Sequence, residues 1–134
     1  MIYLLDTNVC IRYMRGSNLL VRQRLEAKPL QDIRLCSVVK AELYHGALRS
    51  AKPAENRAKV DVFLAPYVSL PFDDPAADLH ATIRHHLETR GTPIGPYDMQ
   101  IAAIARLHGI TLVTHNTNEF SRVPGLLLED WELQ

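Results

Sequence analysis

The sequence lacks the features that mark membrane proteins and disulfide-stabilised secreted proteins. Its longest apolar runs are far shorter than the roughly 20 residues of a transmembrane helix, and its first residues show no basic region ahead of a cleavable apolar segment. Cys10 and Cys36 are its only two cysteines, and both lie in apolar surroundings. These absences predict a soluble, cytoplasmic protein with no membrane partner and with two buried, reduced thiols.

The sequence also lacks an excess of either charge. Fifteen basic and 15 acidic residues give a formal net charge of +0, so any anionic partner must be bound by a local cluster. Eleven of the 15 basic residues are arginines, whose planar fork suits bidentate phosphate contacts, although this bias is also typical of solvated helix faces. Arg12 and Arg15 are the preferred substrate contacts because they closely follow the turn at Asp6.

Several catalytic motifs are missing as well. There is no glycine-rich phosphate loop, no dinucleotide fingerprint and no nucleophile elbow. His80, His85 and His86 share one predicted helix but lack the i, i+4 spacing of a zinc pair. Surface or partly packed histidines are the simpler interpretation.

Short apolar runs alternate with longer helical patterns, which predicts parallel strands joined by crossover helices. With 134 residues and 47% hydrophobic content, the chain is expected to form one α/β domain over residues 1–134. A mainly parallel sheet of four to five strands is expected to be flanked by helices. The predicted strands are residues 2–5, 33–36, 68–72, 110–114 and 126–128.

Helix signals fall between these runs. Helices are predicted over residues 8–14, ended by Gly16, and from residue 19 to Pro29. Ser37 is expected to cap a helix, and another begins at Pro53 and ends before Pro66. Further helices are expected from Asp73 or Asp74 to Gly91 and from Pro96 to Gly109. In the last of these, the residues expected to face inward are Met99, Ala102, Ala103 and Leu107.

Three acids stand near the beginnings of helices. Asp6 ends the first predicted strand, Glu42 lies in the early turns of the helix after Ser37, and Asp98 is the third residue of the helix begun by Pro96. Because parallel strands end at one edge of a sheet, these carboxylates are expected to converge. Repulsion between them is relieved by a hard divalent cation, so the pattern predicts a Mg²⁺ or Mn²⁺ site suited to phosphodiester hydrolysis.

Each acid has a simpler interpretation as a helix cap or a solvated charge. Thr7 either caps the first helix or orients a carboxylate. After the fourth strand, Asn116 and Glu119 either form an ordinary turn or complete the site, and Tyr97 either packs or stacks on an unpaired base.

The segments Leu5-Asp6-Thr7-Asn8, Ala41-Glu42-Leu43 with Gly46, Gly95-Pro96-Tyr97-Asp98 and Val113-Thr114-His115-Asn116 with Glu119-Phe120 together resemble a PIN-domain ribonuclease of the VapC toxin type. The resemblance spans essentially the whole chain. It implies a PIN-like fold, a Mg²⁺- or Mn²⁺-dependent endoribonuclease, Asp6, Glu42 and Asp98 as metal-site residues, a homodimer and a VapB-like antitoxin. It also suggests initiator tRNA, cut in the anticodon loop, as the substrate.

The last motif departs from the family pattern, in which a fourth aspartate is often found. Asn116 and Glu119 occupy that neighbourhood, which leaves open whether one or two ions bind. Two other functions were weighed. An aspartyl-phosphate hydrolase with Asp6 as nucleophile would need a second aspartate at the position of Asn8. A non-catalytic α/β regulatory domain would use the acids only as caps and surface charges.

Overall fold

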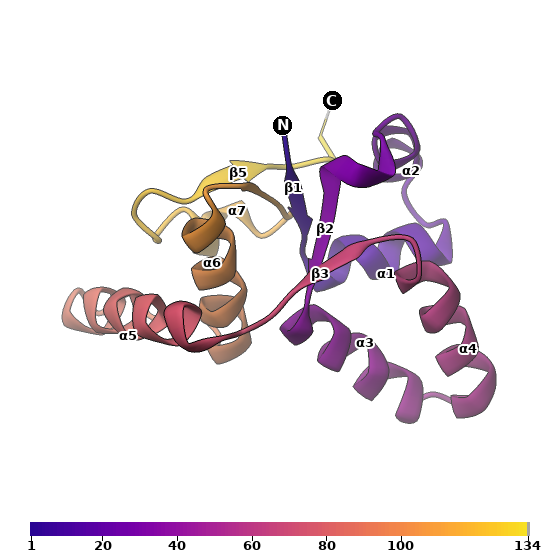
Figure 1. Cartoon of the computed structure of the whole chain (residues 1–134), viewed down its shortest axis with the longest axis horizontal. Helices are drawn as coiled ribbons and strands as arrows, with labels where there is room; N and C mark the ends of the chain where they lie inside the picture. The colour runs from indigo at the N-terminus through magenta and orange to yellow at the C-terminus, as the bar shows by residue number, and fades with distance from the viewer. Residues whose placement is uncertain (134) are drawn as a thin grey trace.

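The computed structural model describes residues 1–133 and contains a five-stranded parallel sheet, flanked by seven α-helices within that range (Figure 1). The strands are Tyr3–Leu5 (β1), Ile33–Cys36 (β2), Val68–Leu70 (β3), Thr111–Val113 (β4) and Leu127–Glu129 (β5). Their order across the sheet is β3-β2-β1-β4-β5, and every neighbouring pair is parallel. The predicted α/β class and parallel sheet are confirmed.

β1 is the central strand, and the chain changes direction across the sheet beside it. From β1 the chain adds β2 and β3 on one side, then returns to add β4 and β5 on the other. Open α/β sheets bind their ligands at such a switch point, outside the carboxyl ends of the strands. This topology therefore marks the carboxyl end of β1 as the position to examine for chemistry.

The helices lie in two groups. In Figure 1, α1, α3 and α4 are gathered on one side of the central strands, and α5 packs along α6 on the other. A 3₁₀ turn, Leu30–Asp32, precedes β2. The helices are Thr7–Arg15 (α1), Leu19–Glu26 (α2), Ser37–Leu48 (α3), Pro53–Leu64 (α4), Asp74–Thr89 (α5), Pro96–His108 (α6) and Thr117–Phe120 (α7).

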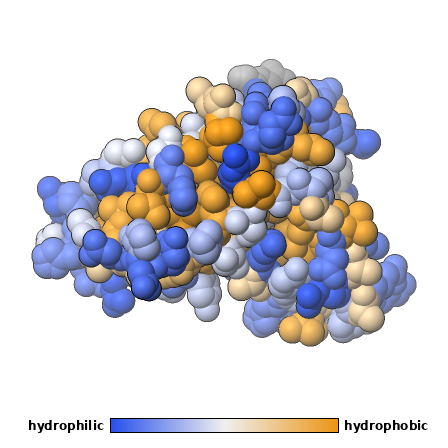
Figure 2. Space-filling model, viewed as in Figure 1, coloured by the Kyte–Doolittle hydropathy of each residue, from blue (hydrophilic) through white to orange (hydrophobic). Residues whose placement is uncertain are grey.

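The core is built around the two most buried strands, β1 and β4. Leu4, Leu5, Leu112 and Val113 have no exposed surface, as expected for parallel strands covered on both faces. The edge strands β3 and β5 are partly exposed. Hydrophilic residues cover the outer part of α5 on the face shown in Figure 2. No helix within residues 1–133 is long and apolar enough to cross a membrane.

Most helix boundaries follow the sequence signals. Gly16 and Gly109 end α1 and α6 in the left-handed conformation, with φ of 64° and 63°. Asp73 caps α5, where its side chain accepts a hydrogen bond from the Ala76 N–H. Cys10 and Cys36 are both buried and free, as predicted.

Four details differ from the prediction. Ser37 is the first residue of α3 rather than its cap, and Cys36 holds the cap position without a side-chain bond. Leu107 is exposed because α6 buries a continuous stretch from Ile101 to Ala105 instead of a single stripe. β3 and β4 are shorter than predicted. The polar segment after β4 contains the short helix α7, which its lack of apolar periodicity concealed.

The C-terminal tail packs back onto the first strand. The rings of Trp131 and Tyr3 lie edge to face with centroids 5.4 Å apart, and the Lys28 ammonium lies 5.6 Å and 5.3 Å from the two centroids. Arg24 donates a hydrogen bond to the Asp130 carbonyl. These contacts fix the end of the chain beside β1 and β4.

Two glycines give a matched test of this backbone. Gly109→Ala is expected to destabilise the protein by about 1 kcal/mol, because alanine is strained at positive φ. Gly46→Ala, inside α3 where an added Cβ meets nothing within 4 Å, is expected to stabilise it by about 0.5–1 kcal/mol. Urea unfolding of both variants checks the opposite signs, and equal effects would contradict the assigned backbone conformations.

Candidate active site

Asp6 lies at the carboxyl end of β1 and is almost completely buried, with 5% of its surface exposed. The register pairs Leu5 with Val113, so the next residue in each strand, Asp6 and Thr114, also meet. The Thr114 hydroxyl donates to Asp6 Oδ2 at 2.8 Å, and the Thr7 N–H donates to Asp6 Oδ1 at 2.8 Å. Both carboxylate oxygens are therefore held in fixed directions.

Thr7 joins Asp6 to the second predicted acid. While its N–H bonds Asp6, its hydroxyl donates to Glu42 Oε1 at 2.7 Å. Glu42 comes from α3, which leaves β2, the neighbour of β1 in the sheet. Asp6, not Thr7, holds the cap position of α1, and Thr7 is the first residue of the helix, so its interpretation as a cap is wrong. The hydrogen bond from its hydroxyl agrees instead with the interpretation that Thr7 orients a carboxylate.

Asp98 occupies the first turn of α6, two residues after Pro96. Among the hydrogen bonds of residues 1–133, its carboxylate accepts none. Instead, it faces the negative charges of Asp6, Glu42 and Glu119. The structure therefore brings together all three acids selected from the sequence, although they come from distant parts of the chain.

Glu119 is the fourth acid at this edge and lies on α7. Asn116 Nδ2 donates to Glu119 Oε2 at 3.1 Å, and the Asn116 N–H donates to the Thr114 hydroxyl at 3.0 Å. Thr114 therefore accepts from Asn116 while it donates to Asp6. A continuous set of hydrogen bonds runs from Asp6 to Glu119 through Thr114 and Asn116.

The electrostatics of the site oppose full ionisation. Burial, together with the negative charges of Asp6, Glu42 and Glu119, raises the pKa of Asp98 to about 6. Burial also raises the pKa of Asp6, and Glu42 adds to this effect, while the hydrogen bonds from Thr114 and Thr7 lower it. The carboxylates are thus held close together at a cost in electrostatic energy.

The two thiols beside the site are unsuited to nucleophilic chemistry. Burial raises the pKa of Cys36 to about 11 and that of Cys10 well above its ordinary value. The negative charge of Asp6 contributes to both shifts. Both thiols are therefore neutral core side chains at physiological pH.

The donor set fits a hard divalent cation. Asp6, Glu42 and Asp98 offer only carboxylate oxygens as ligands. Within residues 1–133 the Asp98 carboxylate accepts no hydrogen bond, and acidic groups surround it. Their oxygens do not form a closed trio, because within residues 1–133 the one group of three ligand atoms lying within 4.8 Å of one another belongs to His115, Asp130 and Glu132. Mg²⁺ accommodates such an open arrangement, since it uses few carboxylates and keeps several waters.

The group formed by His115, Asp130 and Glu132 is a structural network of the tail. His115 Nδ1 lies 2.9 Å from Asp130 Oδ2 and 3.8 Å from Glu132 Oε2. Arg12 Nε lies 3.1 Å from the same Glu132 oxygen, so a cation of the protein already neutralises this position. The network connects α1 and the loop after β4 to the chain's end.

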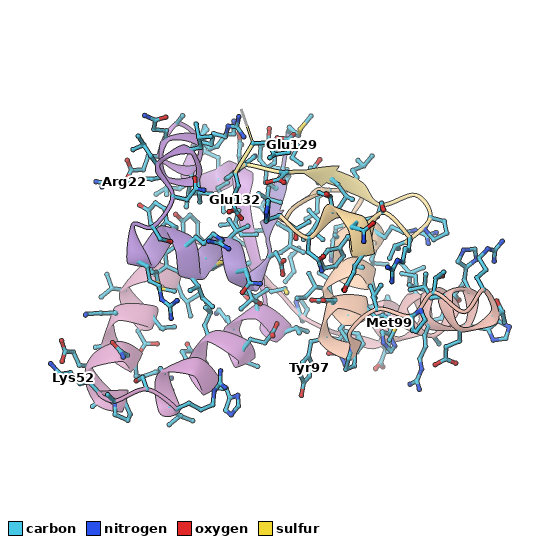
Figure 3. All side chains as sticks on the ribbon, turned by 180° about the vertical axis from the view of Figure 1, so that it is seen from behind. Arg22, Lys52, Tyr97, Met99, Glu129 and Glu132 are labelled. Atoms are coloured by element: carbon cyan, nitrogen blue, oxygen red, sulfur yellow. The ribbon has the colours of Figure 1, made fainter. Side chains whose placement is uncertain are left out.

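The three predicted substrate contacts, Arg12, Arg15 and Tyr97, lie in different surroundings. Arg12 is ion-paired with Glu132, and its role toward substrate stays a prediction. Arg15 lines a cavity that also reaches Glu42. Tyr97 is 58% exposed and points outward from the beginning of α6 in Figure 3, next to Asp98. A ligand at the acids can therefore reach both Arg15 and Tyr97.

Comparison with known proteins agrees with this fold. The PIN domain family matches residues 3–126. The tRNA(fMet)-specific endonuclease VapC of Salmonella typhimurium is 39% identical over 131 residues, which span 96% of this chain and 97% of that protein. The chain belongs to the VapC family of PIN-domain proteins. The resemblance seen in its motifs is confirmed.

Other relatives of this VapC chain extend the comparison. Ribonuclease VapC2 of Rickettsia felis is 36% identical over 98% of this chain and 99% of its own length. Among solved structures, the toxin in DNA-bound VapBC from Salmonella typhimurium matches with a TM-score of 0.91 and 37% identity, covering 98% of both chains. VapBC2 from Rickettsia felis matches with a TM-score of 0.89 and 37% identity, over 98% of this chain and 99% of that one.

The sequence reading missed one residue that organises the site. Thr114 belongs to the motif Val113-Thr114-His115-Asn116, but the motif does not indicate its role. In the structure Thr114 is fully buried and its hydroxyl joins Asp6 to Asn116. A threonine directly after an apolar strand was the available signal. Its partner could not be identified because the pairing of β1 with β4 joins residues 108 positions apart.

The raised pKa of Asp98 predicts a pH-dependent effect on stability. In the metal-free folded protein Asp98 keeps its proton to about pH 6, whereas in the unfolded chain it ionises near pH 4. Stability therefore falls as pH rises through this interval. Asp98→Asn removes the penalty and is expected to stabilise the metal-free protein at pH 7, after allowance for solvent screening, by on the order of 1 kcal/mol.

Thermal unfolding in excess chelator at pH 7 and pH 4 checks this expectation. The stabilisation by Asp98→Asn should be largely lost at pH 4, where Asp98 is protonated in the folded protein and only about half ionised in the unfolded chain. Asp78→Asn, at an exposed position of α5, is the control and should leave the melting temperature nearly unchanged at both values. A destabilised Asp98→Asn protein at pH 7 would show that the carboxylate is not repelled by its neighbours.

Proposed function

We propose that this VapC chain is a divalent-metal-dependent endoribonuclease that acts as a toxin by cleaving RNA and thereby stopping translation. The observation that carries the proposal is the meeting of Asp6, Glu42 and Asp98 at the switch point of the sheet, with Glu119 beside them. Their mutual repulsion favours a bound cation, and the membership of the VapC family supports an RNA substrate.

Asp6, Glu42 and Asp98 would hold Mg²⁺ or Mn²⁺. When bound, the ion would lower the pKa of a water molecule and offset charge on the phosphate oxygens. Thr114 and Thr7 fix the direction of the Asp6 carboxylate, and Thr7 also fixes that of Glu42. Glu119, which accepts a hydrogen bond from Asn116, would accept a proton from the attacking water or orient it.

The structure offers less support for the two other functions. An aspartyl-phosphate mechanism needs a second acid two residues after the nucleophile, but that position holds Asn8, which is exposed. A purely regulatory domain gives no reason to hold repelling carboxylates together in a half-buried position. Neither Asp98 nor Glu42 is needed as a helix cap.

The relatives' names narrow the substrate. Two of them are called tRNA(fMet)-specific endonucleases, from Salmonella typhimurium and Shigella flexneri, at 39% and 40% identity. We propose that initiator tRNA, cut in the anticodon loop, is also the substrate of this chain. Tyr97 would stack on an unpaired base of that loop, because every base offers a face to an aromatic ring. Sequencing the RNA ends that appear on brief expression tests this choice.

We also propose a VapB-like antitoxin as the partner and a homodimer as the assembly. Several matching structures bear the names of complexes: VapBC from Salmonella typhimurium, VapBC2 from Rickettsia felis and FitAcB from Neisseria gonorrhoeae. Co-expression with the product of a small neighbouring gene should relieve toxicity and yield a stable complex. Light scattering of the purified toxin then gives its oligomeric state.

Metal dependence is the first test of the enzyme. The purified, antitoxin-free protein is expected to cleave tRNA with Mg²⁺ or Mn²⁺ and to lose all cleavage in excess chelator. Asp98→Asn is expected to lower the rate at least about 100-fold, because it removes a charged ligand and the fold remains intact. Asp78→Asn serves as the control of equal charge change. Equal cleavage in chelator would disprove the metal mechanism.

The second prediction compares the effects of two substitutions, at Glu119 and at Asp6, on the cleavage rate. Glu119→Gln is expected to reduce the cleavage rate less than Asp6→Asn, because Glu119 lies on the short helix α7 and is held through a single bond from Asn116. Initial rates on the same tRNA, at saturating metal, provide the comparison. A larger loss for Glu119→Gln would make Glu119 a principal ligand of the site.

A further inference from the structure

A cavity with both polar and apolar lining opens beside Glu42, between α1, α3 and α4. Its volume is about 420 Å³, which is within the usual size of ligand sites. Its cationic side chains come from three different helices: Arg15 from α1, Arg49 from the end of α3 and Lys59 from α4. The single carboxylate lining it is Glu42. The cavity is therefore positively charged away from the acid cluster.

The two arginines are available to a ligand. Arg15 and Arg49 are exposed, and within residues 1–133 their guanidinium groups form no ion pair or hydrogen bond. Lys59 makes only a solvent-exposed pair with Glu55, at 3.7 Å. Arg15 and Arg49 lie at the C-terminal ends of α1 and α3, where the helix dipole favours cations. Glu42 is the one carboxylate among the residues that line the cavity.

The cavity also contains hydrogen-bonding groups and open space. Ser50 and Asn56 line it and are joined by a 2.8 Å bond from Asn56 Nδ2 to Ser50 Oγ. Gly46 and Ala47 form part of its wall, and a Cβ added at Gly46 would meet nothing within 4 Å. Small residues on α3 therefore leave room for a group between the arginines.

We propose that this cavity binds a backbone phosphate of the RNA strand next to the one that is cleaved. The inference rests on the proposed nuclease function, because Glu42 belongs both to the acid cluster and to the cavity wall. A strand with one phosphate at the acids must pass its neighbouring phosphates over an adjacent surface. Arg15 and Arg49 offer bidentate forks to such a phosphate, and Lys59 adds a point charge.

RNA fits the cavity better than an acidic protein segment does. An occupant that reaches Glu42 also approaches Asp6 and Asp98, where a bound metal ion would favour a phosphodiester. The cavity lies directly beside this position rather than on a separate face. An acidic peptide remains the alternative occupant that the experiment must distinguish.

Three substitutions test the cavity. Arg15→Gln and Arg49→Gln remove one charge each, and Gly46→Leu fills the space without removing any charge. Arg22→Gln is the matched control, because Arg22 points away from the site in Figure 3 and pairs only with Glu26 on α2. Circular dichroism and melting temperature establish that each variant folds.

Binding and cleavage are measured separately. Affinity for a fluorescent single-stranded RNA is determined in excess chelator at several salt concentrations, and cleavage is followed with Mg²⁺ or Mn²⁺. Each cavity variant is expected to bind RNA about 5- to 10-fold more weakly and to raise KM more than it lowers kcat. The slope of log affinity against log salt should fall by about 0.7 for each lost arginine but not for Gly46→Leu.

The outcomes separate this inference from the nuclease. If the wild type cleaves RNA and the cavity variants behave like Arg22→Gln, the cavity assignment is wrong and the nuclease stands. If the wild type binds RNA through the cavity but never cleaves it, the nuclease is wrong and the cavity stands. If the cavity variants lose affinity for a glutamate-rich peptide but bind RNA as tightly as the wild type does, the cavity belongs to a protein partner and the proposal is wrong.

Discussion

A carboxylate buried at the end of the central strand must be hydrogen-bonded, and the rest of the site follows from how this requirement is met. Asp6 has almost no contact with solvent, so both of its oxygens need donors. Thr7 supplies one through the first turn of α1, and Thr114 supplies the other from the neighbouring strand β4. The same two threonines then orient Glu42 and Asn116. One buried charge thus organises residues from four parts of the chain.

This arrangement works against stability. A fold selected for stability alone would pair the carboxylates with cations, yet the guanidinium of Arg12, on the helix that follows Asp6, pairs with Glu132 on the tail instead. Asp98 accepts no bond in the described chain, and burial together with its acidic neighbours raises its pKa to about 6. Groups held in unfavourable surroundings are typical of active sites, where a ligand relieves the cost. A cation bound here would both stabilise the protein and complete its chemistry.

The neutral net charge of the chain conceals two regions of opposite sign. The acids gather at the carboxyl edge of the sheet, and Arg15, Arg49 and Lys59 surround the neighbouring cavity. Glu42 lies on the boundary between the two. An acidic region next to a basic region suits a nucleic-acid strand that is cleaved at one phosphate and bound at the neighbouring phosphate. Whole-chain charge could not reveal it, because the two regions cancel in the sum.

The sequence by itself determined the α/β class and the positions of nearly all helices and strands, and it singled out the three acids that we propose as metal ligands. These features are local: apolar period, glycine and proline at helix ends, and carboxylates next to strand ends. The tertiary structure alone decided that Thr114 bonds Asp6, that Arg12 serves the tail, and that Arg49 and Lys59 share a cavity with Arg15. Strand order and helix packing create these contacts between residues far apart in the chain, and no local pattern encodes that order.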